Sequence, residues 1–186
     1  MGIRETIATL QAAGPTLTAA AAATCLNPQA KQLIQGGKLG YIGRGLHIKA
    51  SGQISSVITT PGTARFDIRY GGTVIFDSQA ILLDTVAAHT NVGWYLDILL
   101  TMRIVGSSAQ AMGQGIFTCE DILGVPATAS KGVLSAMLPW NTAPALGTAF
   151  DETANGVLDM FFTQTVATGS MTVQQYEVDL ISPYND

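Results

Sequence analysis

Apolar and polar residues alternate along much of this chain after residue 40, with the period of two that is typical of β-strands. The segment ARFDIRY (64–70) has the plainest pattern, because its charged residues fall at every second position, Arg65, Asp67 and Arg69. A strand of this kind has one buried face and one solvated face. The other predicted strands span residues 46–55, 73–77, 93–106, 110–120, 132–138, 156–165 and 170–182.

Glycine-containing turns separate several of these strands. Gly71 and Gly72 join strand 64–70 to strand 73–77 and predict a two-residue hairpin, and Thr168-Gly169 predicts a second hairpin before residue 170. About eight strands punctuated by Gly and Pro predict an all-β fold, an antiparallel β-sandwich. A jelly roll fits best within this class, because the strands are long and a few connections exceed ten residues.

The first thirty residues have a different composition. Residues 7–30 carry no charge, but Glu5 follows Arg4 directly and the segment lacks a Leu-rich centre, so it does not resemble a signal peptide or a membrane segment. We expect a short helix over residues 3–12 and then an extended stretch rich in Thr and Ala. The predicted organisation is an N-terminal arm over 1–30 and a jelly-roll β-sandwich domain over 31–186.

The most apolar long stretch is GWYLDILLTMRIVG (93–106). Its fourteen residues include Asp97 and Arg103 and are fewer than the roughly 20 that a membrane-spanning helix needs. As a strand, its core face consists of Trp94, Leu96, Ile98, Leu100, Met102 and Ile104. The opposite face mixes apolar groups with one acid and one base, which fits a surface covered by a sister subunit. The predicted interface residues are Tyr95, Leu99, Thr101, Arg103 and Val105.

The overall composition also favours self-association. The chain is 47% apolar and only 12% charged, whereas ordinary soluble domains have about 25% charged residues. Thr, Ser, Gln and Asn therefore supply the wettable surface, and copies with so little charge repel one another weakly. An ordinary β protein with a Thr- and Gly-rich exterior is the alternative. The net charge of −4 and the absence of a Lys/Arg run argue against a nucleic-acid partner.

The two cysteines, Cys25 and Cys119, lie in apolar surroundings and are expected to be small buried hydrophobic residues, as in a protein that folds in a reducing cytoplasm. One disulfide between them is the alternative. Of the two histidines, His47 lies in a strand, and no Cys or second His is spaced to share a metal with His89. The glycine-rich segment 36–45 lacks the phosphate-loop pattern. The sequence thus predicts no enzyme, no cofactor and no metal site.

Several segments resemble a group of tailed-bacteriophage virion structural proteins over about residues 30–182. They are TTPGTARFDIRYGGTVIFDS, LLDTVAAHTNVGWYLDILLTMR, MGQGIFTCEDILG, LPWNTAP and LDMFFTQTVATGSMTVQQYEVDLIS. Proteins of this group are similar to the trimeric jelly rolls of tumour-necrosis-factor-like and C1q-like heads. The resemblance implies a virion component and leaves open whether it is mounted on the head or the tail.

Two virion roles follow as expectations. In the first, a homotrimer decorates the capsid exterior and clamps the major capsid protein, after synthesis in the cytoplasm of the host bacterium. The arm residues expected to contact the capsid are Ile3, Ile7, Leu10 and Leu17. In the second, the chain is a tail-fibre or tail-tip head that binds a host glycan or protein; the lack of a shaft-like segment favours the first. A virion carbohydrate-active enzyme is a third and weaker alternative, since no carboxylate pair lies in an aromatic cleft.

Overall fold

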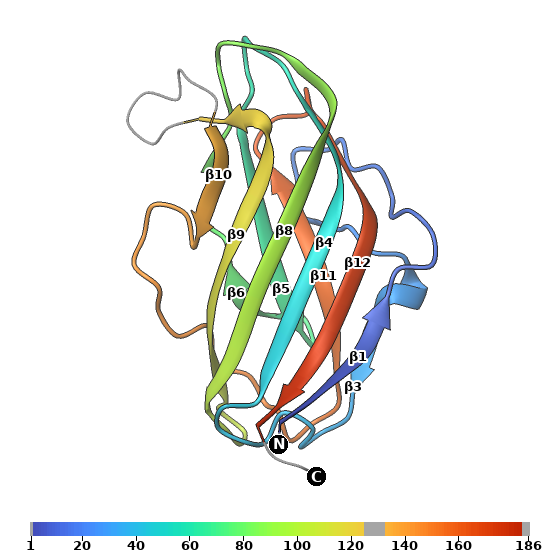
Figure 1. Cartoon of the computed structure of the whole chain (residues 1–186), viewed down its shortest axis with the longest axis vertical. Coiled ribbons are helices and arrows are strands. Elements are labelled where there is room, and N and C mark those ends of the chain that lie inside the picture. The colour runs from blue at the N-terminus through green and yellow to red at the C-terminus, as the bar shows by residue number, and fades with distance from the viewer. Residues whose placement is uncertain (1, 125–132, 184–186) are drawn as a thin grey trace.

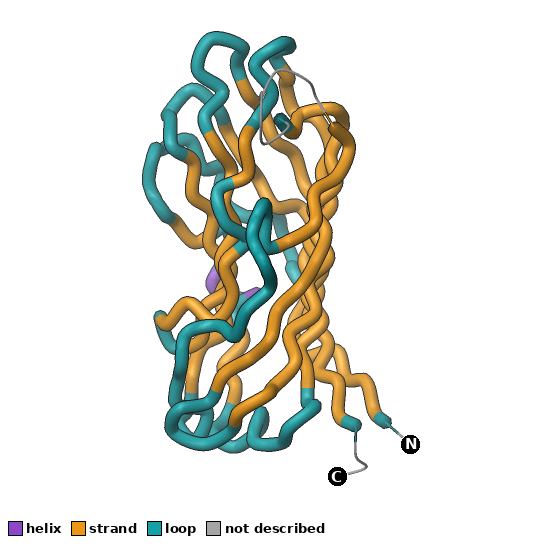
Figure 2. The backbone as a smooth tube through the Cα atoms, turned by 90° about the vertical axis from the view of Figure 1, so that its left-hand side faces the viewer, coloured by secondary structure: helices purple, strands orange, loops and turns teal. Residues whose placement is uncertain are grey.

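The computed structural model describes residues 2–124 and 133–183, which form two antiparallel sheets packed face to face (Figures 1 and 2). Sheet A contains, in spatial order, β1 (Ile3–Thr9), β12 (Ser170–Ser182), β4 (Gly45–Ser56), β8 (His89–Ile104), β9 (Gln110–Leu123) and β10 (Val133–Leu138). Sheet B contains β2 (Ala23–Thr24), β11 (Gly156–Gln164), β5 (Thr63–Tyr70) and β6 (Thr73–Asp77), with β3 (Gln32–Ile34) beside β11 and β7 (Ile81–Leu82) beside β5. The all-β prediction is confirmed.

Helical structure in the described residues is limited to one 3₁₀ turn, η1 (Pro28–Ala30). No helix in residues 2–124 and 133–183 is long and apolar enough to cross a membrane.

The strands pair from the outside of the chain inward. β1 pairs with β12, β2 and β3 pair with β11, β4 pairs with β8, and β5 pairs with β6. β9 and β10 then extend sheet A beyond β8. Sheet A and sheet B are therefore built from alternating parts of the sequence, and the chain crosses between them at both ends of the sandwich.

An aromatic cluster lies at the centre of the core. The ring of Phe66 on β5 is 5.5 Å from Trp94, 5.0 Å from Phe117 and 5.3 Å from Phe162, measured between ring centroids. These four residues come from β5, β8, β9 and β11, so the cluster joins sheet A to sheet B. The predicted apolar face of strand 64–70 and the predicted hairpin at Gly71-Gly72 are confirmed. The predicted solvated face is wrong at Asp67, which is only 3% exposed because its carboxylate accepts hydrogen bonds from the side chain of Arg69 on the same face.

The predicted hairpin at Thr168-Gly169 is wrong. β11 and β12 are consecutive in the sequence but belong to different sheets. The reason is that β11 has partners along both of its edges, β5 on one side and β2 and β3 on the other. β12 instead fills the position between β1 and β4 in sheet A.

The predicted core face of β8 is confirmed from Trp94 to Met102 and wrong at its end. Ile104 is 42% exposed, and Val105 packs against the core in its place. The register of the β8–β9 ladder shifts between Met102 and Ile104. Such an irregularity moves the following side chains to the other face of the sheet, so Val105 leaves the predicted subunit interface.

The predicted helix over residues 3–12 is also wrong, because Ile3–Thr9 forms β1. Its β-branched residues favour a strand, and the edge of β12 supplies a hydrogen-bonding partner along its length. The rest of the first thirty residues lies along the sandwich as well: Cys25 and Leu26 are core residues, and Leu17 bridges to Met171. The division of the chain into an arm over residues 1–30 and a domain over 31–186 stays a prediction.

Candidate interaction surface

The outward-facing side of sheet A carries the exposed residues of β8 and is the candidate interaction surface. Cross-strand register places Leu99 between His47 on β4 and Gln114 on β9, and it places Asp97 between Lys49 and Ile116. Residues directly opposite one another in a ladder point to the same face, so these side chains form continuous rows across the sheet.

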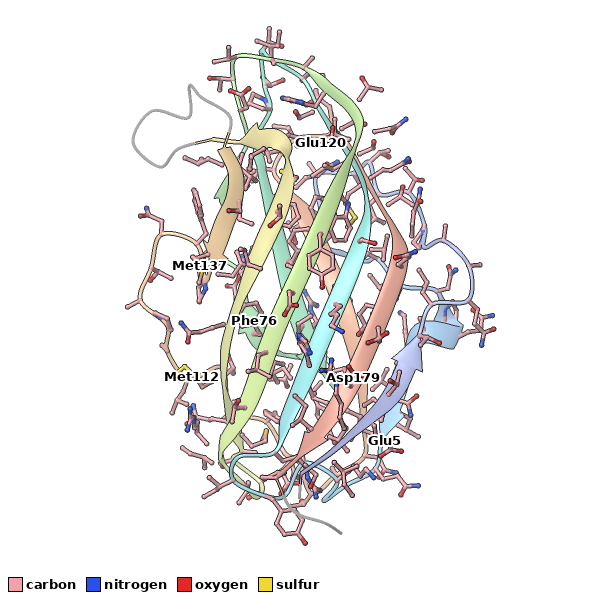
Figure 3. The ribbon with its side chains drawn as sticks, in the orientation of Figure 1. Glu5, Phe76, Met112, Glu120, Met137 and Asp179 are labelled. Atoms are coloured by element: carbon pink, nitrogen blue, oxygen red, sulfur yellow. The ribbon has the colours of Figure 1, made fainter. Side chains whose placement is uncertain are left out.

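One half of this surface is mainly apolar, and we call its apolar side chains, Tyr95, Leu99, Ile116 and Met137, the apolar strip. Asp97 lies among them, opposite Ile116 in the β8–β9 ladder. Tyr95 is 42%, Leu99 45% and Met137 66% exposed, whereas Ile116 is half-buried between its neighbours. Ile116 pairs directly with Met137 on β10, so the strip crosses β8, β9 and β10. Figure 3 places Met137 at one side of the front sheet and Asp179 at the other.

Four of the five predicted interface residues lie on the outward side of β8. Tyr95 and Leu99 belong to the apolar strip, Thr101 is half-buried, and Arg103 is exposed near the end of the strand. The fifth, Val105, packs against the core instead. Sequence reasoning missed Met137, although the signal was present: in the segment LSAML, Ala136 and Leu138 alternate with it as core residues.

The other half of the surface is polar and begins at the buried carboxylate of Asp179 on β12. Arg4 Nε donates a hydrogen bond to Asp179 Oδ2 at 2.6 Å, and Thr6 Oγ1 donates one to Oδ1 at 2.6 Å. Burial by itself raises the pKa of the Asp179 carboxyl, but the hydrogen bonds from Thr6 and Arg4 bring that pKa below its ordinary value. The carboxylate therefore links the side chains of β1 to β12 within sheet A.

His47 continues this polar chain towards β8. Its Nδ1 is 2.7 Å from Arg4 Nη2, and its Nε2 is 2.8 Å from Asp97 Oδ1. A guanidinium only donates, so Nδ1 accepts from Arg4 and the ring hydrogen lies on Nε2, which donates to Asp97. The Tyr95 hydroxyl donates a hydrogen bond to the other oxygen of the same carboxylate, Asp97 Oδ2, at 3.3 Å. The predicted position of His47 in a strand is confirmed, and its hydrogen bonds link β1, β4 and β8.

A shallow hollow of about 250 Å³ lies where the two halves meet. Side chains that line it are Lys49, Ser51, Tyr95, Gln175 and Glu177. They combine one aromatic ring with hydroxyl, amide, carboxylate and ammonium groups, the mixture that recognises polar ligands.

The polar chain predicts a specific pH dependence of stability. Asp179→Asn is expected to lower the free energy of unfolding by about 2 kcal/mol at pH 7, because charged hydrogen bonds are lost. A carboxyl whose pKa is depressed by folding stabilises the protein above its unfolded pKa of about 3.9, and this contribution disappears as the pH falls through the lower folded value.

The difference between wild type and Asp179→Asn should therefore shrink from pH 7 to pH 3 in urea denaturation curves. Glu5→Gln on the same strand is the control, since Glu5 is exposed and 3.6 Å from exposed Lys38; it should change stability by less than about 0.5 kcal/mol. A constant difference across this pH range would contradict the role given to Asp179.

The predicted capsid-contacting residues have two different environments. Ile3 is 46% exposed at the edge of sheet A, whereas Ile7, Leu10 and Leu17 are partly buried against the core of the sandwich. Their contact with a capsid stays a prediction. Among them, Ile3 offers the largest accessible apolar side chain.

The remaining candidate groups are dispersed. Cys25 and Cys119 are buried and form no disulfide with each other. Burial, with a contribution from the charge of Asp159, raises the pKa of the Cys25 thiol, which leaves it a poor nucleophile. In the described part of the chain, no three or more His, Cys, Asp or Glu side chains gather into a group that could hold a metal ion.

Comparison with protein-family models gives no match, and comparison with curated proteins gives none either. Among solved structures, the chain is similar to the CBM2 module of the evolved Dit of Lactobacillus casei BL23 phage J-1, with a TM-score of 0.39 and 10% identity over 100% of this chain and 99% of that module. A likeness of this size carries no argument about function.

Proposed function

We propose that this protein is a phage virion structural protein that forms a homotrimer and decorates the capsid exterior by binding the assembled major capsid protein. The observation that carries the proposal is the apolar strip on sheet A. Tyr95, Leu99 and Met137 are exposed together on one face, where a monomer gains nothing from them. The role needs no catalytic group and no cofactor.

The distribution of charges on this face supports the proposal that another copy of the chain binds there. The polar half beside the strip carries both signs: Lys49 is 3.3 Å from Glu177, and Asp97 accepts from His47. A surface with acids and bases side by side can oppose a copy of itself without net repulsion. Closed symmetry then buries the strip of every protomer in the same way.

The nested strand pairing supports a jelly roll. A jelly roll forms when a long antiparallel pair of chain segments folds over on itself. The first strand then pairs with the last strand, the second strand pairs with the next to last, and the pattern continues inward. β1 with β12, β4 with β8 and β5 with β6 follow that order, and β9 and β10 are then an addition to one sheet. We assign the sandwich to this class on that ground.

The capsid contact is proposed at the free edge of sheet A. β1 pairs with β12 on one side, and its other edge has no strand beside it among the described residues. An extended capsid segment can add there as a strand, with Ile3 supplying an apolar contact. A protein that binds only the assembled shell stabilises that shell by mass action.

Capsid binding should depend on Ile3. Ile3→Glu is expected to weaken co-sedimentation with capsids stripped of this protein by about tenfold or more, since burying one such side chain contributes about 1.5–3 kcal/mol. Val157→Glu is the matched control, because Val157 is 41% exposed on sheet B. Equal binding of both variants would contradict the proposed contact. Deleting residues 1–30 is a poorer test, because it removes the core residues Cys25 and Leu26.

A tail-fibre or tail-tip head that binds a host glycan or protein is the second candidate. The hollow beside Tyr95 favours it, since about 250 Å³ accommodates a sugar ring next to an aromatic side chain and several hydrogen-bonding groups. Imaging of virions with a label on this protein distinguishes the two: many copies over the head support decoration, and a few at the tail support adhesion.

A further inference from the structure

Three polar residues, Ser56, Asp84 and His89, lie at the end of the sandwich away from both termini, where β4 ends and β8 begins (Figure 1). Ser56 and His89 face each other in the β4–β8 ladder, so their side chains leave the sheet on the same side. Asp84 lies in the loop before β8, with its carboxylate Oδ2 3.7 Å from His89 Nε2. Ser56 is 3% exposed and Asp84 2%.

Two atoms of this group are buried without a hydrogen bond. Ser56 Oγ and His89 Nε2 both lack a hydrogen-bond partner. Buried polar atoms nearly always have a hydrogen-bond partner or another ligand, so two such atoms on residues that face each other in the ladder leave room for a further binding partner.

The distance between the Asp84 carboxylate and the His89 ring indicates that this binding partner is a metal ion. A distance of 3.7 Å exceeds the 2.7–3.2 Å range of ordinary hydrogen bonds. Zinc binds imidazole nitrogen at about 2.0–2.1 Å and carboxylate oxygen at about 2.0–2.2 Å, so two such ligands at a tetrahedral angle are about 3.4 Å apart. The observed distance is within a few tenths of an ångström of that value.

The carboxylate is also held in place. The backbone N–H of Val86 donates to Asp84 Oδ1 at 2.9 Å, and that of Ala87 donates to Oδ2 at 3.2 Å. Hydrogen bonds of this kind fix the orientation of a ligating carboxylate in metal sites.

A serine-hydrolase triad does not explain the same residues. That chemistry requires the serine hydroxyl to be hydrogen-bonded to the histidine that takes its proton. Ser56 Oγ has no hydrogen bond, and Ser56 is buried where a substrate cannot reach it.

We infer that Asp84 and His89 bind a divalent transition-metal ion of the zinc class, with the Ser56 hydroxyl as a neighbouring third donor. An imidazole with a carboxylate suits zinc or cobalt, whereas calcium and magnesium prefer oxygen ligands alone. With two ionisable ligands, the affinity is lower than that of a three-ligand site. The bound ion ties the loop before β8 to the end of β4, and the inference is independent of the proposed function.

The test is a metal titration of the full chain after dialysis against EDTA. Zinc chloride at ten times its dissociation constant is expected to raise Tm by about 3–6 °C, and calorimetry should give one ion per chain. Cobalt chloride should produce visible absorption bands, and calcium or magnesium chloride should leave Tm unchanged.

His89→Gln should abolish the zinc-dependent rise in Tm. His47→Gln is the control and should retain that rise, because His47 lies elsewhere, on the outward side of β4. Circular dichroism before the titration shows that each variant is folded. Absence of a rise with zinc, cobalt and nickel in the wild type would overturn the inference. A full rise in folded His89→Gln would do the same.

Discussion

Phe66→Ala is expected to lower the free energy of unfolding by about 3–5 kcal/mol, the range typical of large-to-small changes in a core. The Phe66 side chain is completely buried, and its ring contacts those of Trp94, Phe117 and Phe162. Removing the ring therefore leaves a cavity that borders both sheets at once. Urea denaturation followed by tryptophan fluorescence measures the loss, because Trp94 is one of the contacts.

Phe161→Ala provides the matched control. Phe161 is half-buried on the outward side of sheet B, where its ring lies 3.7 Å from the Arg69 guanidinium carbon. Its removal exposes a surface that solvent can reach and leaves no enclosed cavity, so a loss below about 2 kcal/mol is expected. Equal losses for the two variants would contradict the central position given to the aromatic cluster.

The alternation of apolar residues predicted most strands, because a sheet face buries every second side chain whichever strand lies beside it. Residues 64–70 and the core face of β8 are examples. The same local pattern does not show which strands pair with one another. Whether β12 pairs with β11 or with β1 and β4 depends on which edges are already occupied, and the turn at Thr168-Gly169 contains no information about that.

Two errors have the same long-range origin. Ile3–Thr9 is a strand because β12 offers it an edge, a partner about 170 residues away in the sequence. Ile104 and Val105 exchange faces because the ladder with β9 contains an irregularity. Neither the edge nor the irregularity is visible in the segment itself, so a helix and an uninterrupted strand were reasonable local predictions.

Only those parts of the candidate surface that lie within one strand were predictable from the sequence. Tyr95 and Leu99 stand out within a single strand as apolar residues on a face that also holds charges. The chain from Arg4 through His47 to Asp97 joins three strands that are distant in the sequence, and only the register of sheet A brings them together. The pair Asp84 and His89 is close in sequence, but its orphaned atoms become apparent only in the fold.

Leu99→Glu is expected to convert a homotrimer into monomers. Multi-angle light scattering should give about 58 kDa for the wild type, three times the 19.4 kDa chain, and 19.4 kDa for the variant. Burying Leu99 contributes about 1.5–3 kcal/mol in each protomer, and the change occurs three times in a trimer. A buried unpaired carboxylate in each copy adds a further penalty.

Leu33→Glu is the control for charge and exposure. Leu33 is 53% exposed on β3 of sheet B, a surface assigned no role in self-association, so this variant should remain trimeric. Circular dichroism should show that both variants are folded, because Leu33 and Leu99 are already about half exposed in the single chain. A molecular mass of one chain for the wild type at micromolar concentration would contradict the proposed homotrimer. The apolar strip would then be free for a partner of another kind, and the hollow beside Tyr95 would become the stronger basis for a function.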